Sequence, residues 1–321
     1  MGRMRTSLPA LIAIVVLYVG VPLVLGGKNY VMTVIIAALI IGGLALSWAL
    51  LNNLGGMVSF GHAAFFGVGA YTSALLTIKA GWPVFPAMLM GALAAMIASL
   101  AMLPALRLRE AFFALAILAY AEIFRILAIQ FESLTGGAGG LLSIASFPTL
   151  LGFDFSSKLG SYLIILTVVV LFVLVYWRLH KSDYGMALRA MHESQEAATV
   201  VGVNSTLLKA LMLMLAAFMA GLVGAFNVHF IGFLDPDYAF SVDWSMLPII
   251  AAIIGGQRTI LGPIGGAVIV YLFDQLLLKS WLPTGHEMVL GALLAAVIIL
   301  SPAGIWPLLT QRWRRSHHAA G

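Results

Sequence analysis

The chain has 321 residues, of which 62% are hydrophobic and 9% are charged, and its formal net charge is +5. A composition this apolar excludes an ordinary soluble globular domain of this length and indicates a polytopic membrane protein. The chain has no cysteine, which excludes disulfides and thiolate metal sites, and its basic residues are scattered in short loops, which argues against a nucleic-acid partner.

Apolar runs long enough to cross the hydrocarbon core of a bilayer follow one another along the chain. A membrane-spanning helix needs roughly 20 mainly apolar residues. We predict spans at residues 9–26, 30–51, 62–78, 84–106, 110–131, 159–177, 207–231, 262–278 and 286–306, with a short tenth near 245–256. The predicted fold is an all-α polytopic membrane protein of about ten transmembrane helices, with 8 to 10 compatible with the runs, and residues 1–321 form a single transmembrane domain.

The distribution of lysine and arginine predicts the orientation, because these residues are retained in cytoplasmic loops. In a ten-span topology, 12 lysine and arginine residues fall on the side of the N-terminus, and only Lys28, Lys79, Lys158 and Lys279 fall on the other side. We therefore expect both termini to be cytoplasmic, with two longer external loops at residues 132–158 and 232–244. Either external loop is a docking surface or a plain connection between helices.

Two glycine-rich stretches interrupt the apolar runs: NNLGGMVSFGHAAFF at residues 52–66 and IIGGQRTILGPIGGA at residues 253–267. A helix break at membrane depth is tolerated where it faces protein or a water-filled path. We predict interrupted helices near residues 52–62 and 253–266. Their candidate pathway residues are Gly55, Gly56, Ser59, Gly61, His62, Phe65, Gly255 and Gly256, and the alternative is tight helix packing with a hydrogen-bonded histidine.

Glu122 and Arg125 are charged residues inside a predicted span. A charge at the bilayer centre costs roughly 3 kcal/mol on insertion scales unless it is paired or hydrated. Because they are three residues apart on one helix, we expect a structural ion pair that faces the bundle. The alternative is a gate or a polar patch for a zwitterionic solute, so both are also candidate pathway residues.

The largest internal loop, residues 178–206, carries good helix formers in AMHESQEAATVV, between Gly185 and Gly202. We predict a short amphipathic helix with Ala197, Val200 and Val201 on one face and Glu193 and Glu196 on another. Its acidic residues disfavour an anionic lipid surface. Docking into a groove of a soluble partner is the preferred interpretation, and a helix lying on lipid is the alternative.

Three motifs carry a family resemblance. The pattern EAA-x-x-x-G at Glu196, Ala197, Ala198 and Gly202 resembles the cytoplasmic loop of bacterial ABC-importer permeases, in which a coupling helix contacts the ATP-binding subunit. The segment ALRAMHESQEAA and the stretch SFGHAAFFGVGAY are similar to branched-chain amino acid permeases of the LivM type, as is the late GG-x-x-T-x-x-G-P-x-x-G-A segment. The isoleucine and Leu-Pro pair that many ABC permeases carry after the glycine are absent here.

The resemblance implies a permease subunit of an ATP-driven importer for leucine, isoleucine and valine, placed in a bacterial inner membrane. Its implied partners are a second related permease, two cytoplasmic ATP-binding subunits and an extracytoplasmic solute-binding protein. ATP and Mg²⁺ belong to the ATP-binding subunits, and this chain has no G-x-x-x-x-G-K-[ST] phosphate loop of its own, so it is expected to be neither an enzyme nor a cofactor binder. The residues implied for ATPase coupling are Arg189, Glu193, Glu196, Ala197, Ala198 and Gly202.

Other functions remain open at the level of sequence. Related permeases carry urea, short amides or sugars. An ion-coupled secondary transporter has Glu122, Asp274 or His62 as candidate ionisable groups, but it leaves the EAA loop unexplained. No serine, histidine and acid grouping indicates an intramembrane enzyme, and no HExxH-type pair predicts a metal site.

Overall fold

The computed structural model describes residues 14–278, apart from Arg109 and Leu151, together with isolated positions between 281 and 296. Seven of its helical segments are long and apolar enough to cross a membrane, which confirms an all-α polytopic membrane fold. Two shorter apolar helices, Val16–Leu25 and Gly262–Phe273, coincide with further predicted spans. The span predicted at 286–306 lies mostly outside the described residues, and the count of ten and the orientation of the termini stay predictions.

The described elements follow the predicted order closely. They are η1 (Val16–Gly20), α2 (Val21–Leu25), α3 (Asn29–Gly55), α4 (His62–Ala80), α5 (Val84–Ala98), η2 (Ser99–Arg107), α6 (Glu110–Gln130), α7 (Glu132–Thr135), η3 (Gly137–Gly139), β1 (Thr149–Leu150), β2 (Phe153–Asp154), α8 (Lys158–His180), α9 (Asp183–Glu193), α10 (Gln195–Val200), α11 (Ser205–Ile231), α12 (Pro236–Ala239), α13 (Asp243–Gly255), α14 (Gly262–Phe273) and η4 (Asp274–Leu278).

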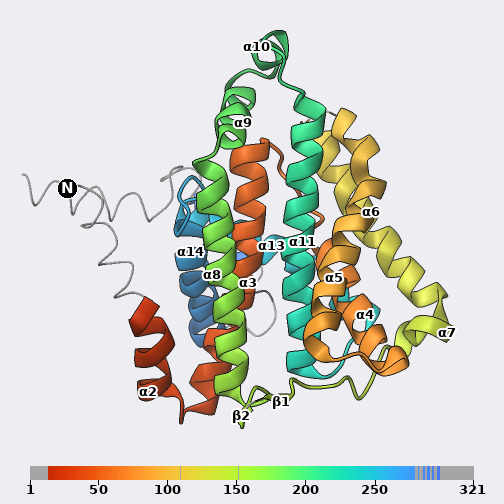
Figure 1. Ribbon diagram of the computed structural model, residues 1–321, viewed down its shortest axis with the longest axis vertical. Helices are drawn as coiled ribbons and strands as arrows, with labels where there is room; N and C mark the ends of the chain where they lie inside the picture. Colours follow the sequence, from red (N-terminus) through yellow and green to blue (C-terminus); the bar gives the residue numbers. More distant parts are fainter. Residues whose placement is uncertain are drawn as a thin grey trace, which may run out of the picture.

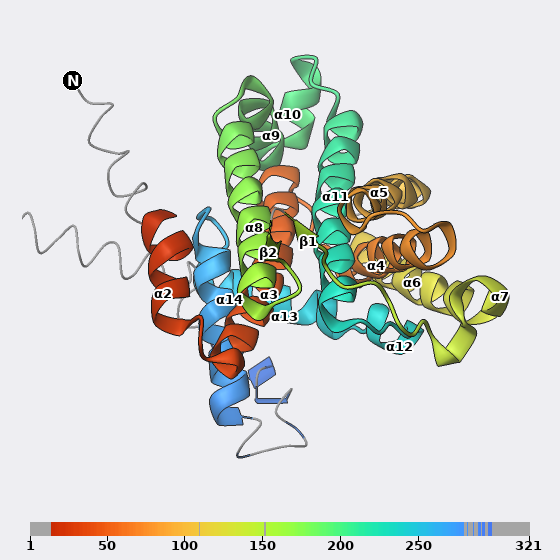
Figure 2. The ribbon, with the colours of Figure 1, turned by 60° about the horizontal axis from the view of Figure 1, so that its bottom comes forward.

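The helices form two groups that meet along α3 and α11. One group contains α3, α8, α13 and α14, and the other contains α4, α5 and α6, which extend from α11 (Figures 1 and 2). α9 and α10 lie at one end of the bundle, and the β1–β2 hairpin and α7 lie at the opposite end (Figure 1). This places the loop 178–206 and the loop 132–158 at opposite ends, as the sequence predicted.

The loop 232–244, predicted to be external, folds inward. Its backbone first pairs with the other long loop through a bridge between Leu141 and Leu234. The turn α12 then packs on α4 and α6, and the Phe240 ring stacks on Tyr71 near the middle of α4, with ring centroids 5.9 Å apart. Its aromatic side chains thus find apolar partners between the helices, and the side of the membrane on which this loop lies stays a prediction.

Small residues allow α4, α5 and α11 to pack closely. A Cβ added to Gly69 would lie 2.1 Å from the carbonyl oxygen of Gly221, and one added to Gly91 would lie 2.5 Å from the carbonyl oxygen of Gly69. Such close backbone approach is the usual basis of helix association in a bilayer, where lipid tails are as apolar as the side chains. The three helices therefore depend on these glycines for their spacing.

We expect Gly69→Val to destabilise the fold by at least about 2 kcal/mol, because the added side chain must displace the backbone of α11. The free energy of unfolding in mixed detergent micelles measures this. Gly139→Ala is the matched control, since a Cβ there meets nothing within 4 Å. An unchanged stability for the Gly69 variant would contradict the packing described.

Candidate functional site

The chain reverses between α3 and α4 instead of continuing as one helix. α3 ends at Gly55, and Gly56 has a φ of +65°, a left-handed conformation that favours glycine. The chain then returns alongside α3: Trp48 Nε1 on α3 donates a hydrogen bond to the carbonyl oxygen of Ser59 at 2.9 Å. Trp48 precedes Gly55 by seven residues, about 10 Å of helix rise. Residues 57–61 therefore carry the chain back into the bundle before α4 begins.

The first turn of α4 meets the first turns of α13. The first N–H groups of a helix have no partner within the helix, so they need one elsewhere when they are buried. The N–H of Ala63 donates to Ser245 Oγ on α13 at 3.0 Å, and the N–H of Gly61 donates to Ser59 Oγ at 3.3 Å. Two serine hydroxyls thus stabilise a helix start inside the bundle.

His62 is fully buried at the start of α4. The hydroxyl of Ser47 donates to the carbonyl oxygen of Ala216 at 2.8 Å, so the His62 Nε2–H, 3.3 Å away, is the donor to Ser47 Oγ. This assigns the ring hydrogen to Nε2 and leaves Nδ1 as a bare acceptor. Nδ1 has no hydrogen-bond partner among the described residues.

The structure brings four of the predicted pathway residues together at this helix start. Ser59, Gly61, His62 and Phe65 are all buried there, and the Phe65 ring meets the His62 ring edge to face, with centroids 6.0 Å apart. A Cβ on Gly61 would lie 2.1 Å from the side chain of Ile117, so glycine allows α6 to approach this point. Their role in a substrate path stays a prediction.

The second predicted break lies beside the first one. α13 ends at Gly255, Gly256 has a φ of +105°, and α14 begins at Gly262. Asn52 Nδ2 donates to Gln257 Oε1 at 2.8 Å, and Asn53 Nδ2 donates to the carbonyl oxygen of Gln257. The two asparagines thus join the connection between α13 and α14 to the end of α3. The interruptions near 52–62 and 253–266 are confirmed, but the glycine pairs stand at helix ends and not in mid-helix.

The predicted helix of the loop 178–206 is two helices. Ser194 separates them with an extended backbone, φ −155° and ψ 104°, and its hydroxyl accepts the N–H of Ala197 at 3.2 Å as the N-cap of α10. Glu193 is the last residue of α9, and Glu196 lies in the first turn of α10. The prediction that these two acidic residues share one face of a continuous helix was wrong.

Two valines at the end of α10 point outward. Ala198 is buried, whereas Val200 is 87% exposed and Val201 is 78% exposed. The turn ends at Gly202, which has a φ of +92°. At the base of this unit Arg189 Nη1 donates to the carbonyl oxygen of His180 at 2.7 Å, which holds α9 to the end of α8.

A polar cavity of about 1190 Å³ lies between α10, α9 and the ends of α3 and η2. Its lining includes Gly56, Arg107, His192 and Glu196. His192 of α9 packs directly on Gly56, because a Cβ there would lie 3.0 Å from His192 Nδ1. The α9–α10 unit therefore touches the chain at the point where it leaves α3 for the return segment.

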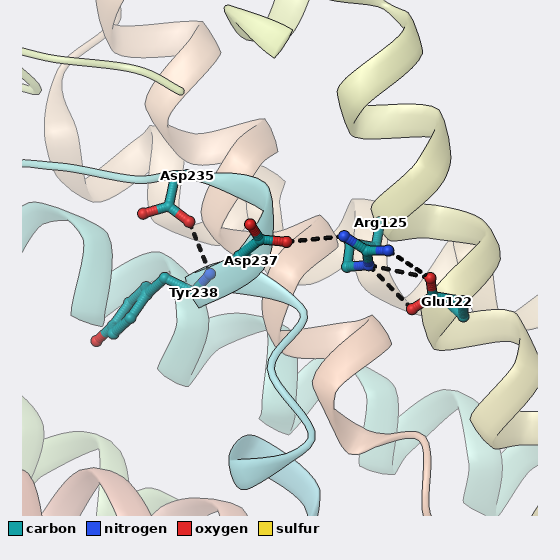
Figure 3. A network of polar contacts seen from close by, with 5 residues as sticks. All are labelled: Glu122, Arg125, Asp235, Asp237 and Tyr238. Atoms are coloured by element: carbon teal, nitrogen blue, oxygen red, sulfur yellow. Dashed lines mark hydrogen bonds and ion pairs between the residues drawn. The ribbon is translucent and has the colours of Figure 1, made fainter. Parts of the chain in front are cut away.

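Glu122 and Arg125 form the predicted ion pair, with 2.6 Å between Arg125 Nη2 and Glu122 Oε1. Arg125 Nη1 also contacts Asp237 Oδ1 of α12 at 2.7 Å, while the side chain of Asp235 caps the turn by accepting the N–H of Tyr238 (Figure 3). The pair does not face the bundle: the Glu122 side chain is 54% exposed and that of Asp237 is 82% exposed. That part of the prediction was wrong: the pair lies on the exposed face of α6, where Asp237 of α12 joins it.

Sequence reasoning missed several partners of the predicted residues, chiefly Trp48, Ser245, Asp237 and His192. Local spacing gives no signal for Ser245 and Asp237, since they meet α4 and α6 from far along the chain. Serine at an N-cap position is a readable signal, and it marks the start of α10 at Ser194. Among the described residues no three histidine, aspartate or glutamate side chains are grouped as metal ligands.

Comparison with known proteins identifies relatives over most of the chain. The family described as branched-chain amino acid transport system, permease component, matches residues 11–298. The chain is 27% identical to the high-affinity branched-chain amino acid transport system permease protein LivM of Escherichia coli strain K12, over 97% of this chain and 77% of that protein. No solved structure matches.

A second type of permease is also similar. The high-affinity branched-chain amino acid transport system permease protein LivH of Escherichia coli strain K12 is 25% identical over 82% of this chain and 89% of that protein. The probable branched-chain amino acid transport permease protein LivM of Methanocaldococcus jannaschii is 23% identical over 90% of this chain and 86% of that protein.

We expect Ser245→Ala to lower the free energy of unfolding by about 1 to 3 kcal/mol, because it leaves the buried N–H of Ala63 without an acceptor. Chemical unfolding in mixed micelles measures the change. Thr33→Ala is the control, since that exposed hydroxyl only donates to a carbonyl oxygen of its own helix. Equal effects of the two substitutions would contradict the role assigned to Ser245.

Proposed function

This chain belongs to the family of permease components of branched-chain amino acid transport systems, and from that premise we propose that it is a membrane subunit of an ATP-driven importer for leucine, isoleucine and valine. In this proposal it forms the translocation path together with a second, related permease. The membrane is the bacterial inner membrane, the α9–α10 end is cytoplasmic, and a binding protein delivers substrate at the opposite end.

One observation carries the coupling part of the proposal: the EAA segment is presented outward on α10 while its supporting helix α9 touches the α3–α4 connection. The exposed Val200 and Val201 offer an apolar contact, and the exposed Glu196 offers a charged one. A soluble partner that covers this face buries apolar surface, which favours association. We assign this partner as one of two ATP-binding subunits, which hold ATP and Mg²⁺.

Movement of α9 has a physical route to the interior. His192 packs on Gly56, and from Gly56 the chain runs through residues 57–61 to the start of α4. The left-handed Gly56 is a position at which backbone angles change at low cost. We propose that closure of the ATP-binding subunits displaces α9 and α10. This displacement then breaks the packing and hydrogen bonds around Ser59 and His62 at the start of α4.

The start of α4 is suited to a substrate with a carboxylate. Helix N-termini carry partial positive charge, and discontinuous helices in transporters direct these ends at anionic groups of the substrate. Here the beginnings of α4 and α13 meet through Ala63 and Ser245. In the proposed cycle their separation exposes N–H groups and His62 to the amino acid.

Uptake into proteoliposomes tests the function as a whole. The vesicles hold this chain, its partner permease, the ATP-binding subunits and the binding protein, with ATP inside or absent. The proposal predicts leucine accumulation only with ATP, with competition by isoleucine and valine. If urea, short amides or sugars compete and these amino acids do not, the substrate assignment is wrong. Uptake by this chain alone under an ion gradient would overturn the ATP-driven mechanism.

In the same vesicles we expect Glu196→Lys to lower ATP-driven uptake by roughly tenfold or more, because it reverses the charge that faces the ATP-binding subunit. ATP hydrolysis by the complex continues, so hydrolysis and uptake become separated. Glu196→Asp, which keeps the negative charge at this position, is the matched control and keeps most of the uptake. Normal uptake by the Glu196 variant would reject the coupling assignment.

A further inference from the structure

α6 differs from the other membrane-spanning helices in what its exposed face carries. In the segment Phe112–Gln130 the exposed residues recur at helical spacing and are Phe112, Leu115, Ala119, Glu122, Ile123, Ile126, Leu127 and Gln130. Only 28% of this segment is buried. Glu122 stands next to the midpoint of the segment, so a charge lies at the centre of an exposed stripe that is otherwise apolar up to Gln130 at its end.

The exposed face of α8 is the natural comparison. Before its last turn it presents Thr167, Leu171, Leu174 and Val175, with no charged side chain among them. Hydrocarbon accepts such a face, whereas it does not accept a charged group at the same depth. The outward faces of α6 and α8 therefore need different surroundings.

The charged cluster on α6 is not neutral and not fully satisfied. Glu122, Arg125 and Asp237 together carry a formal charge of −1. Arg125 uses one N–H on each of its three nitrogens toward the two carboxylates, and a guanidinium has five N–H donors, so two remain. The cluster calls for further donors opposite its carboxylates and for acceptors near Arg125.

Water alone does not fit this face, because the side chains that flank the cluster are large and apolar. Next to Glu122 on this face, Ile123 is 48% exposed and Ile126 is 45% exposed. An apolar stripe with a polar centre matches the anatomy of a protein interface, in which a few directed contacts sit within apolar packing. The surface that meets all these demands is a neighbouring membrane helix with a basic or hydrogen-bonding side chain at mid-depth.

We propose that this face of α6, with Asp237 of α12, is the surface on which the second permease docks. The proposal rests on the proposed function for the existence of that subunit. The similarity of this chain to permeases of both the LivM and the LivH type supports a related chain as the occupant. The Glu122–Arg125–Asp237 cluster then fixes the register of the two permeases along the membrane normal.

Site-specific photocrosslinking in the assembled complex tests the docking surface. A benzophenone-bearing amino acid replaces Ala119 on the α6 face or, as the matched control, Leu171 on the exposed α8 face. Irradiation in native membranes is expected to yield a product with the partner permease from position 119 and none from position 171. A product from position 171 alone, a product of two copies of this chain, or no protein product from position 119 would overturn the proposal.

Charge reversal in the photoreactive chain adds a second readout. Glu122→Lys is expected to lower the yield from position 119 roughly tenfold, because it places a positive charge opposite the donors of the partner. Glu132→Lys, outside the stripe, leaves the yield unchanged. Equal yields for the two variants would reject the cluster as a contact. Because crosslinking requires no ATP, a failure of ATP-driven uptake with a normal crosslink would reject the transport mechanism and leave the interface standing.

Discussion

Every backbone N–H and C=O at membrane depth must find its partner within protein, and this constraint governs the two helix breaks of the fold. The return segment 57–61 is held by the Trp48 indole, and the start of α4 is held by Ser59 and Ser245. In the connection between α13 and α14, Asn53 of α3 donates to the backbone carbonyl oxygen of Gln257, and Asn52 donates to the Gln257 side chain. The unusual polar residues in an apolar chain are thus the partners of backbone groups that lipid leaves unsatisfied.

The first break also connects the α9–α10 end of the molecule with the interior of the bundle. α9 and α10 are amphipathic and stand outside the bundle, yet His192 touches Gly56, where the first break begins. A movement of α9 or α10 can therefore reach the buried start of α4 through the His192–Gly56 contact and the chain segment 57–61. A continuous pair of long helices would offer no such path, because it has no joint at which the backbone can turn.

Much of this arrangement was predictable from sequence. The apolar runs predicted the order of the described spans, and the glycine pairs predicted both interruptions. Local signals failed where distant segments meet. Nothing near Asp237 indicates that α12 packs on α6 and brings this carboxylate to Arg125, and nothing near Arg125 indicates that its ion pairs lie on an exposed helix face. The division into α9 and α10 at Ser194 could have been predicted, because serine favours the N-cap of a helix over its interior.

The labelling of a single cysteine at position 59 tests the central claim, that the α9–α10 unit controls the α3–α4 break. The chain has no cysteine of its own, so Ser59→Cys gives a unique thiol that is buried here. A charged, water-soluble thiol reagent is applied to the assembled complex without nucleotide and after trapping with ATP and vanadate. If α9 and α10 control the break, the labelling rates differ by roughly tenfold between the two states. A control variant, Thr199→Cys on the exposed surface of α10, shows whether the nucleotide changes labelling of α10 itself. Equal rates at position 59, with rates at position 199 that do change, would contradict control of the break by α9 and α10.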